Sequence, residues 1–535
     1  MNHFLSKLLL FIILFFCTFE VGAQQKRPDR PLLVVGIVVD GLQQMHLNSM
    51  MDGFDTNGFK AFVNHGTKCP NIVYNTVSAG NAPDWASLMT GSVPFYHGIS
   101  SGNFFDKKTR SIVSVLNDER QAGIGTWEKY SAQRLLASTV LDELSIANAH
   151  LSKNYTVAIN ADDAIMLGGH TARAVAWIDD VNLKWVTTAY YADGLSRSAD
   201  EMNTGYFQLL ASRDWEPIST VASYLYPSTT EGAKRKGFKY SPTDKKQASA
   251  STIIKNTPAA NALVTELAIK IIQDERLGKD QYPDMLMLQY TVVTPKERMG
   301  ALQIAEKEDM YKRLDREIQH LMQQIEKTAG LDNTLIFLTG NQTTLHYPAD
   351  LTEHNIPSGY FVADRSMALL NTYLMAIYGQ EQWVLGYYGK NIYLNKQKME
   401  QRGFDFSKVR QQVADFMLEF EGIQAAYTTS QVLHSSGDFR SETSKLRNSY
   451  HNNQIGDVII TLLPGWMEVD EKNRHVDLSN DIQSYVPLFL YGWKIPSKTI
   501  HSTYRIVDVA PTLSRILDIP FPNANLGQPI EEIFE

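Results

Sequence analysis

The sequence is poor in cysteine and has no block of basic residues. Its cysteines are Cys17 and Cys69, too few for a disulfide framework or a cysteine-based metal site. The 50 Lys and Arg against 58 Asp and Glu give a net charge of −8. A mildly acidic chain without a basic patch is a poor candidate for nucleic-acid binding, so we expect no nucleic-acid partner.

Long apolar runs are also missing, since none approaches the roughly 18 residues that suggest a membrane span. The N-terminus instead has the pattern of a secretory signal: Lys7, a short apolar run over 8–16, and small residues at 21–23 before Gln24. We expect residues 1–23 to be a cleaved signal peptide and the mature chain to be periplasmic or secreted, with no membrane span. Cys69 is then a lone thiol, which we expect to be a small buried apolar residue.

The remaining chain has an ordinary globular composition, with 44% hydrophobic and 20% charged residues. Unbroken apolar runs predict strands that are buried on both faces of a parallel sheet, whereas apolar residues at helical spacing predict helices. The predicted strands are 32–39, 284–290, 334–339 and 486–491, and the predicted helices are 259–274, 309–327 and 507–517. The last predicted strand contains Pro487. This proline indicates either that it lies near the start of the strand or that the strand lies at an edge of the sheet. This alternation predicts an α/β fold with a doubly wound, mostly parallel central sheet and helices on both faces.

Two stretches are richer in Tyr, Ser, Thr and charged residues than the predicted core. They run from about 160 to 255 and from about 354 to 451. We interpret residues 24–535 as one domain with these two insertions, which we expect to cap the carboxyl ends of the strands. Open α/β sheets place their sites at those ends.

Three motifs in order resemble the alkaline phosphatase superfamily. They are Val-Val-Asp at 38–40, Thr-Gly-Ser-Val-Pro at 90–94 followed by His-Gly-Ile at 97–99, and Ile-Val-Asp-Val-Ala-Pro-Thr-Leu at 506–513. The chain is most similar to the branch of type I phosphodiesterases, nucleotide pyrophosphatases and threonine-nucleophile periplasmic phosphatases. The resemblance implies an alkaline phosphatase-like fold and a two-zinc site, with three Asp, three His and a hydroxyl nucleophile. Such a site activates the hydroxyl and neutralises the phosphoryl oxygens.

This sequence departs from that pattern at most of its functional positions. Asp40 matches the first aspartate, but Asn81 stands at the nucleophile position, and an amide cannot form a phosphoryl ester. The Asp-x-x-x-His ligands are replaced by Thr294 and Arg298, and the adjacent Asp-His pair by Asn341 and Gln342. Tyr485 stands where the last histidine is expected, although a register further upstream would meet His475.

These losses together indicate a catalytically degenerate protein that acts by binding a ligand or an envelope protein, without a cofactor. We expect Arg298, or alternatively Lys296, to supply positive charge to Asp40. An equally open reading places Arg298 on a surface loop. Asn81 is expected at or near the N-cap of a helix, where weak anion binding is an alternative role.

Other functions stay open at this point. The chain could be a metal-dependent phosphomonoesterase, or a phosphodiesterase or nucleotide pyrophosphatase, with a rebuilt site; zinc would be a cofactor only in that case. The candidate ligands of such a site are His346, His354 and His475. A third possibility is a structural subunit of an envelope complex, which predicts an exposed apolar patch.

Overall fold

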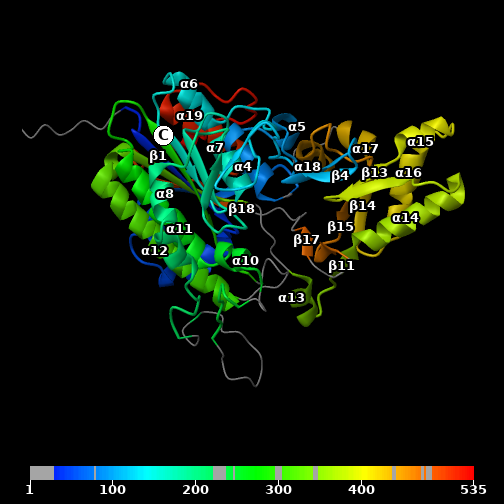
Figure 1. Cartoon of the computed structure of the whole chain (residues 1–535), viewed down its shortest axis with the longest axis horizontal. Coiled ribbons are helices and arrows are strands. Elements are labelled where there is room, and N and C mark those ends of the chain that lie inside the picture. Colours follow the sequence, from blue (N-terminus) through cyan, green and yellow to red (C-terminus); the bar gives the residue numbers. More distant parts are fainter. Residues whose placement is uncertain are drawn as a thin grey trace, which may run out of the picture.

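The fold is built on one large sheet whose middle strands are parallel (Figure 1). The computed structural model describes residues 29–77, 80–220, 224, 237–244, 248–295, 304–341, 347–435, 441–470, 475–477 and 485–535. The sheet has 11 strands. In spatial order they are β19 (Lys498–Thr499), β2 (Thr67–Val73), β18 (Tyr485–Gly492), β10 (Thr334–Gly340), β1 (Leu33–Asp40), β9 (Asp284–Thr291), β6 (Asn154–Val157), β7 (Ala174–Ile178), β8 (Trp185–Thr188) and β5 (Gly123–Ile124), with β20 (Tyr504–Arg505) beside β2.

Strands β10, β1, β9, β6 and β7 pair in parallel, whereas β18 is antiparallel to both β10 and β2. Strand β1 lies in the middle, and every one of its residues is buried. The predicted α/β class and the predicted central strands are therefore confirmed. The unbroken apolar runs marked strands with no solvent-facing side.

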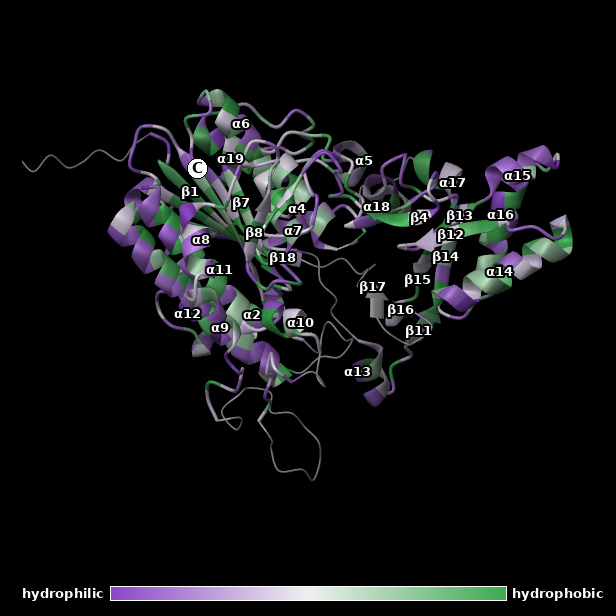
Figure 2. Ribbon diagram, viewed as in Figure 1, coloured by the Kyte–Doolittle hydropathy of each residue, from purple (hydrophilic) through white to green (hydrophobic). Residues whose placement is uncertain are grey.

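Side chains of β1 alternate between two hydrophobic cores, one on each face of the sheet. Leu33, Val35 and Ile37 belong to one core, and Val34 and Val38 to the other. Figure 2 shows these strands in hydrophobic colours between helices whose outer faces are hydrophilic. Because each face needs its own apolar cover, helices pack on both sides.

The two helical layers lie on opposite sides of the sheet in Figure 1. One layer contains α2 (Gln44–Met50), α3 (Phe59–His65), α8 (Arg197–Asn203), α9 (Tyr206–Ala211), α10 (Ala250–Lys255), α11 (Pro258–Asp274) and α12 (Ile304–Thr328). The other contains α4 (Asn81–Thr90), α5 (Pro94–His97), α6 (Val140–Ala147), α7 (Ala161–Gly168) and α19 (Val509–Leu517). The predicted helices correspond to α11, α12 and α19.

Pro487 lies inside the sheet, because β18 has a hydrogen-bonded neighbour on each side. The prediction that the strand could be an edge is wrong, while a place near its start is right. The register with β2 shifts between Val486 and Leu488, so the proline occupies an irregularity where its missing N–H costs no ladder bond.

A second unit, drawn in yellow and orange, lies to one side of the large sheet (Figure 1). It has its own hydrophobic core around Leu370, Trp383 and Val458. Its elements are α13 (Pro348–Glu353), β11 (Gly359–Val362), α14 (Ala363–Tyr378), β12 (Val384–Tyr388), β13 (Asn391–Leu394), α15 (Lys396–Gln401), α16 (Phe406–Met417), β14 (Ile423–Thr428), α17 (Thr429–Leu433), α18 (Glu442–Ser449), β15 (Val458–Leu462), β16 (Trp466–Val469) and β17 (His475–Asp477). We call it the inserted unit; it continues past residue 451, because β15 pairs with β13 and β14.

The segment 160–255, expected to be a cap, instead contributes β7 and β8 to the large sheet. The physical reason is the apolar stretch Ala174–Ile178, whose last four residues are buried. Cys69 is fully buried on β2, as predicted, and burial raises the pKa of its thiol to about 12. Among the described helices, none combines the length and apolar character of a membrane span. The predicted signal peptide, with Cys17, lies outside the described residues.

Candidate functional site

Three strands bring the site residues together at one edge of the large sheet. Parallel pairing of β1 with β9 and β10 sets Asp40 level with Thr291 and Val39 level with Gly340. The chain leaves β1 through Gly41, whose φ of +81° suits glycine, and a Cβ there would stand 2.6 Å from a methyl group of Val293. The carboxyl ends of the parallel strands thus meet as predicted for an α/β site.

The amide of Asn341 ties this edge to α4. Its Nδ2 donates to Oδ1 of Asp40 at 3.0 Å and to Oδ1 of Asn81 at 2.7 Å. Its own Oδ1 accepts the backbone N–H of Gly41 at 2.9 Å. Asp40 and Asn341 are both buried, so these bonds satisfy polar groups that have little contact with water.

Asn81 is the first residue of α4, and Gly80 occupies the N-cap position without a side-chain cap. Asn81 therefore lies next to the N-cap, as predicted, but its side chain does not cap the helix. To cap the helix, its side-chain oxygen would have to accept an N–H group of the first turn. It accepts the amide N–H of Asn341, which directly follows β10, instead.

A buried lysine that the sequence did not single out lies next to this network. Lys307, in the first turn of α12, is 0% exposed, and its Nζ stands 3.4 Å from the place of a Cβ on Gly41. Burial, together with the charge of Lys307, lowers the pKa of His46 to about 4. A positive charge therefore lies at the carboxyl end of β1, close to the backbone that follows Asp40.

Two further carboxyl groups are buried near the site. Asp163 on α7 accepts the indole N–H of Trp85 at 2.8 Å and an amide N–H of Asn160 at 3.0 Å. Burial, with Asp162 and Asp40 nearby, raises the pKa of Asp163 well above its usual range. Asp84 on α4 is 1% exposed. The pKa of Tyr74 is raised, mainly because Tyr74 is buried and also because of the negative charge of Asp84.

The network opens into a cleft of about 680 Å³ between the large sheet and the loops above it. The charged side chains among its described lining residues are mainly acidic. They are Asp40, Glu128, Asp162 and Asp180, against Lys255. Lys255 is itself paired with Asp180 at 2.7 Å. Asn160 and Asp162 also line the cleft, so this part of its wall offers an anion no positive charge.

The structure places the other predicted positions as follows. Thr294 is fully buried just after β9, on the same edge as Asp40. Tyr485 is the first residue of β18, where it pairs with Val73 of β2, and its side chain is 49% exposed. His354 is the C-cap residue of α13 and is exposed to solvent, with its Nδ1 2.9 Å from the carbonyl of Asp350 in that helix.

The remaining predicted residues fall outside the described residues. These are Lys296, Arg298, Gln342, His346 and the side chain of His475, whose backbone lies in β17. The pairing of Arg298 or Lys296 with Asp40 therefore stays a prediction. Among the described residues, no group of three or more His, Cys, Asp or Glu side chains has the arrangement of a metal site.

The described residues at this edge do not fit a pair of zinc ions. Zinc takes imidazole, thiolate or carboxylate ligands, about four per ion in closed sites. Here an amide N–H of Asn341 points at the Asp40 carboxylate, and N–H groups repel a cation rather than bind it. Thr294 and Asn81 add only neutral oxygens. We therefore derive no chemistry through zinc for this site.

A mostly parallel sheet, covered on both faces, with its cleft at the carboxyl ends of the strands, is an alkaline phosphatase-like phosphoesterase fold. The model of the type I phosphodiesterase / nucleotide pyrophosphatase family matches residues 34–484. The chain belongs to this family, as its motifs predicted.

Three relatives match over nearly their whole length. Alkaline phosphatase PafA of Elizabethkingia meningoseptica is 26% identical over 528 residues, covering 96% of each chain. Alkaline phosphatase PhoV of Synechococcus elongatus is 26% identical, covering 95% of this chain and 93% of its own. A protein named calcium-transporting ATPase from Myroides odoratus is 28% identical, covering 97% of both. The crystal structure of PafA superposes with a TM-score of 0.85 over 95% of this chain and 99% of that one.

Proposed function

We propose that this chain is an exported, catalytically degenerate member of its family that acts by binding a ligand or a partner. The observation that carries the proposal is the Asn341 amide, which joins Asp40 to Asn81. Hydrogen bonds of this kind stabilise the strand edge without a metal. They also occupy the one carboxylate that matches the family's ligand pattern.

The acidic character of the cleft supports a role in binding a ligand rather than in hydrolysing phosphate esters. A phosphoryl group carries negative charge and needs cations or N–H donors around it. The described walls instead present Asp162 and Glu128, while Asp180 and Lys255 pair with each other. An anionic substrate would therefore meet repulsion, whereas a neutral or cationic ligand would not.

The test is to purify the chain from residue 24, incubate it with excess zinc, remove free ions and measure bound zinc. We expect less than about a tenth of an equivalent, and no hydrolysis of p-nitrophenyl phosphate or bis-p-nitrophenyl phosphate. A matched control restores the family pattern with Asn81→Thr, Thr294→Asp, Arg298→His, Asn341→Asp, Gln342→His and Tyr485→His. This control should bind more zinc than the natural chain, which shows that the assay can detect a site.

The alternative is a metal-dependent phosphomonoesterase, phosphodiesterase or nucleotide pyrophosphatase with a rebuilt site. It is favoured by relatives named alkaline phosphatases that match over nearly the whole chain. It predicts about two zinc equivalents in the natural chain and turnover that falls when Asp40→Asn is introduced. Either result would overturn the proposal that the chain is catalytically degenerate. His346 and His475 would then be the first candidate metal ligands to test.

A further inference from the structure

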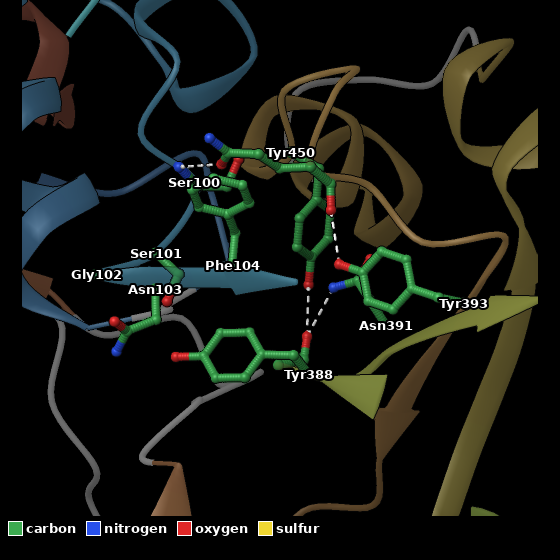
Figure 3. Close-up of a pocket in the computed structure, with 11 residues that line it drawn as sticks. Ser100, Ser101, Gly102, Asn103, Phe104, Tyr388, Asn391, Tyr393 and Tyr450 are labelled. Atoms are coloured by element: carbon green, nitrogen blue, oxygen red, sulfur yellow. Dashed lines mark hydrogen bonds between the residues drawn. The ribbon is translucent and has the colours of Figure 1, made fainter. Parts of the chain in front are cut away.

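A second, smaller pocket lies beside the cleft, where the core meets the inserted unit (Figure 3). Its volume is about 190 Å³. The core supplies residues 100–104, at the start of the hairpin formed by β3 (Asn103–Asp106) and β4 (Ser111–Ser114). The inserted unit supplies β12, β13 and the stretch after α18. Gly102 and Asn103 line both this pocket and the large cleft, so the two are continuous.

The walls of the pocket are aromatic and uncharged. Phe104 comes from the core, and Tyr388, Tyr393 and Tyr450 come from the inserted unit (Figure 3). None of the described residues that line it carries a charge. Such a surface favours a neutral ligand with an apolar face, because a buried charge without a partner is costly.

Hydrogen bonds hold these walls in place. The hydroxyl of Tyr393 donates to the carbonyl of Gln454 at 2.7 Å, and that of Tyr450 to the carbonyl of Gly389 at 3.4 Å. The amide of Asn391 donates to the same Gly389 carbonyl at 2.8 Å. A pocket formed before its ligand arrives loses little conformational entropy on binding.

The rim offers polar groups for a ligand. Within the described part of the chain, the side chains of Ser101 and Asn103 have no hydrogen-bond partner. Asn103 is exposed on the side shared with the cleft. A hydroxyl and an amide next to aromatic rings can satisfy several ligand hydroxyls while the rings cover C–H groups.

From this combination we propose that the pocket binds a neutral sugar ring. A sugar has C–H faces that pack on tyrosine and hydroxyls that bond to Ser101 and Asn103. The volume is smaller than the roughly 300–1,000 Å³ of pockets for drug-sized molecules, so it accepts one ring rather than a larger compound. The acidic cleft next door disfavours a nucleotide, because its phosphate would lie beside Asp162 and Glu128. This inference rests on the proposed function, since it names the ligand class of a binding protein.

The experiment is a titration of the full mature chain, followed by calorimetry and saturation-transfer NMR. The probes are the methyl glycosides of glucose, galactose, mannose and N-acetylglucosamine, with adenosine as a neutral comparison. At least one glycoside should bind with a Kd below about 10 mM. Tyr388→Ala and Asn103→Ala should each weaken that binding by about tenfold. Tyr360→Ala, an exposed tyrosine on β11 away from the pocket, should leave it unchanged.

The proposal is overturned if no glycoside binds, if adenosine binds instead, or if Asn103→Ala leaves glycoside binding unchanged. Asn103 is an exposed rim residue, so this variant tests the pocket even if Tyr388→Ala fails to fold. Zinc content and ester hydrolysis are measured on the same preparation. A zinc-free, inactive chain that binds no sugar would overturn the sugar site and leave the degenerate reading standing.

Discussion

Asn341 uses both ends of its amide to hold the candidate site together. Its N–H donors reach Asp40 and Asn81, and its oxygen accepts the N–H of Gly41. An aspartate in its place could accept but not donate. The difference between an amide and a carboxylate at this single position therefore decides whether the strand edge is stable without a cation.

We predict that Asn341→Asp lowers the free energy of unfolding by about 2–4 kcal/mol in the presence of a chelator. The new carboxylate would face Asp40, and the oxygen of Asn81 would lose its donor. Zinc should restore part of the loss, since a cation can bridge the two carboxylates. Denaturant unfolding with and without zinc measures both effects.

The control for this variant is Asn523→Asp. The exposed side chain of Asn523 accepts the N–H of Ser138 at 3.0 Å, a role that aspartate fills equally well. Its stability should change little and should not respond to zinc. Equal behaviour of the two variants would contradict the role given to the Asn341 amide.

At the residue scale, the sequence motifs placed Asp40, Asn81 and Asn341 at one site, but the hydrogen bonds between these side chains could not be predicted from them. Asp40 and Asn341 follow buried strands, so their meeting could be predicted from strand ends alone. Lys307 could not, because it stands in a run of charged residues, Glu306 to Asp309, that resembles a solvated helix face. In the structure the run is buried, and several of its polar groups have partners there: Trp215 and Tyr224 donate to Asp309 at 2.6 and 2.5 Å, and Tyr240 donates to Glu306 at 3.0 Å.

At the scale of elements, the interface between α11 and α12 contains a carboxyl group whose pKa is raised. Burial, with the charge of Glu266, raises the pKa of Glu317 on α12 to about 7, whereas Thr265 on α11 lowers it by a hydrogen bond. In an unfolded chain a glutamate titrates near 4.3. The fold therefore prefers the protonated group, and stability falls as pH rises from about 4 to about 7.

We predict that Glu317→Gln removes this cost while keeping a hydrogen-bond acceptor for Thr265. The variant should match the natural protein near pH 4 and exceed its unfolding free energy by about 1–3 kcal/mol at pH 8. Denaturant unfolding across this pH range is the measurement. Glu353→Gln, at an exposed position on α13, serves as the control and should follow the natural protein at every pH. Parallel curves for Glu317→Gln and the natural protein would contradict the prediction.

The helices and central strands were the most predictable part of the molecule. The stripe of Tyr311, Leu314, Ile318, Leu321 and Ile325 is fully buried on α12, because a period of 3.6 residues leaves a helix only one face to pack. Pro487 was less predictable. A proline's tolerance depends on the local register with β2, which is a property of two strands rather than of one sequence.

At the scale of the whole molecule, the inserted unit is joined to the core both by apolar packing around Val77 and by buried polar contacts. The side chain of Gln454 accepts the N–H of Ser100 at 3.3 Å and donates to the carbonyl of Gly98 at 3.0 Å. The backbone N–H of His451 donates to Oγ of Ser100 at 2.8 Å. These contacts also form one side of the small pocket.

We predict that Gln454→Ala lowers the unfolding free energy by about 1–3 kcal/mol, because it leaves the Ser100 N–H and the Gly98 carbonyl without partners. The same variant should weaken ligand binding in the small pocket, since its wall shifts. Gln401→Ala, on the exposed end of α15, is the control and should change neither property. An unaltered unfolding curve for Gln454→Ala would show that the junction is held elsewhere.

The sequence indicated that insertions exist but not where they belong. Composition alone separated residues 160–255 and 354–451 from the core, yet the first stretch supplies strands to the large sheet. Whether a strand joins an existing sheet or starts a new one depends on contacts between residues far apart in the chain. Those contacts leave no mark on local composition.

In the inserted unit's three-stranded sheet, β11 from the start of the unit lies beside β16 and β17 from its end: β11 runs parallel to β16, with Gly359 level with Trp466, and β17 pairs with β16. The polypeptide therefore enters and leaves that unit at nearly the same place. Units attached in this way can be exchanged or resized without moving the scaffold that carries them. Over evolutionary time the unit can diverge faster than the sheet, and a lineage can acquire a new ligand while its ancestral fold stays intact.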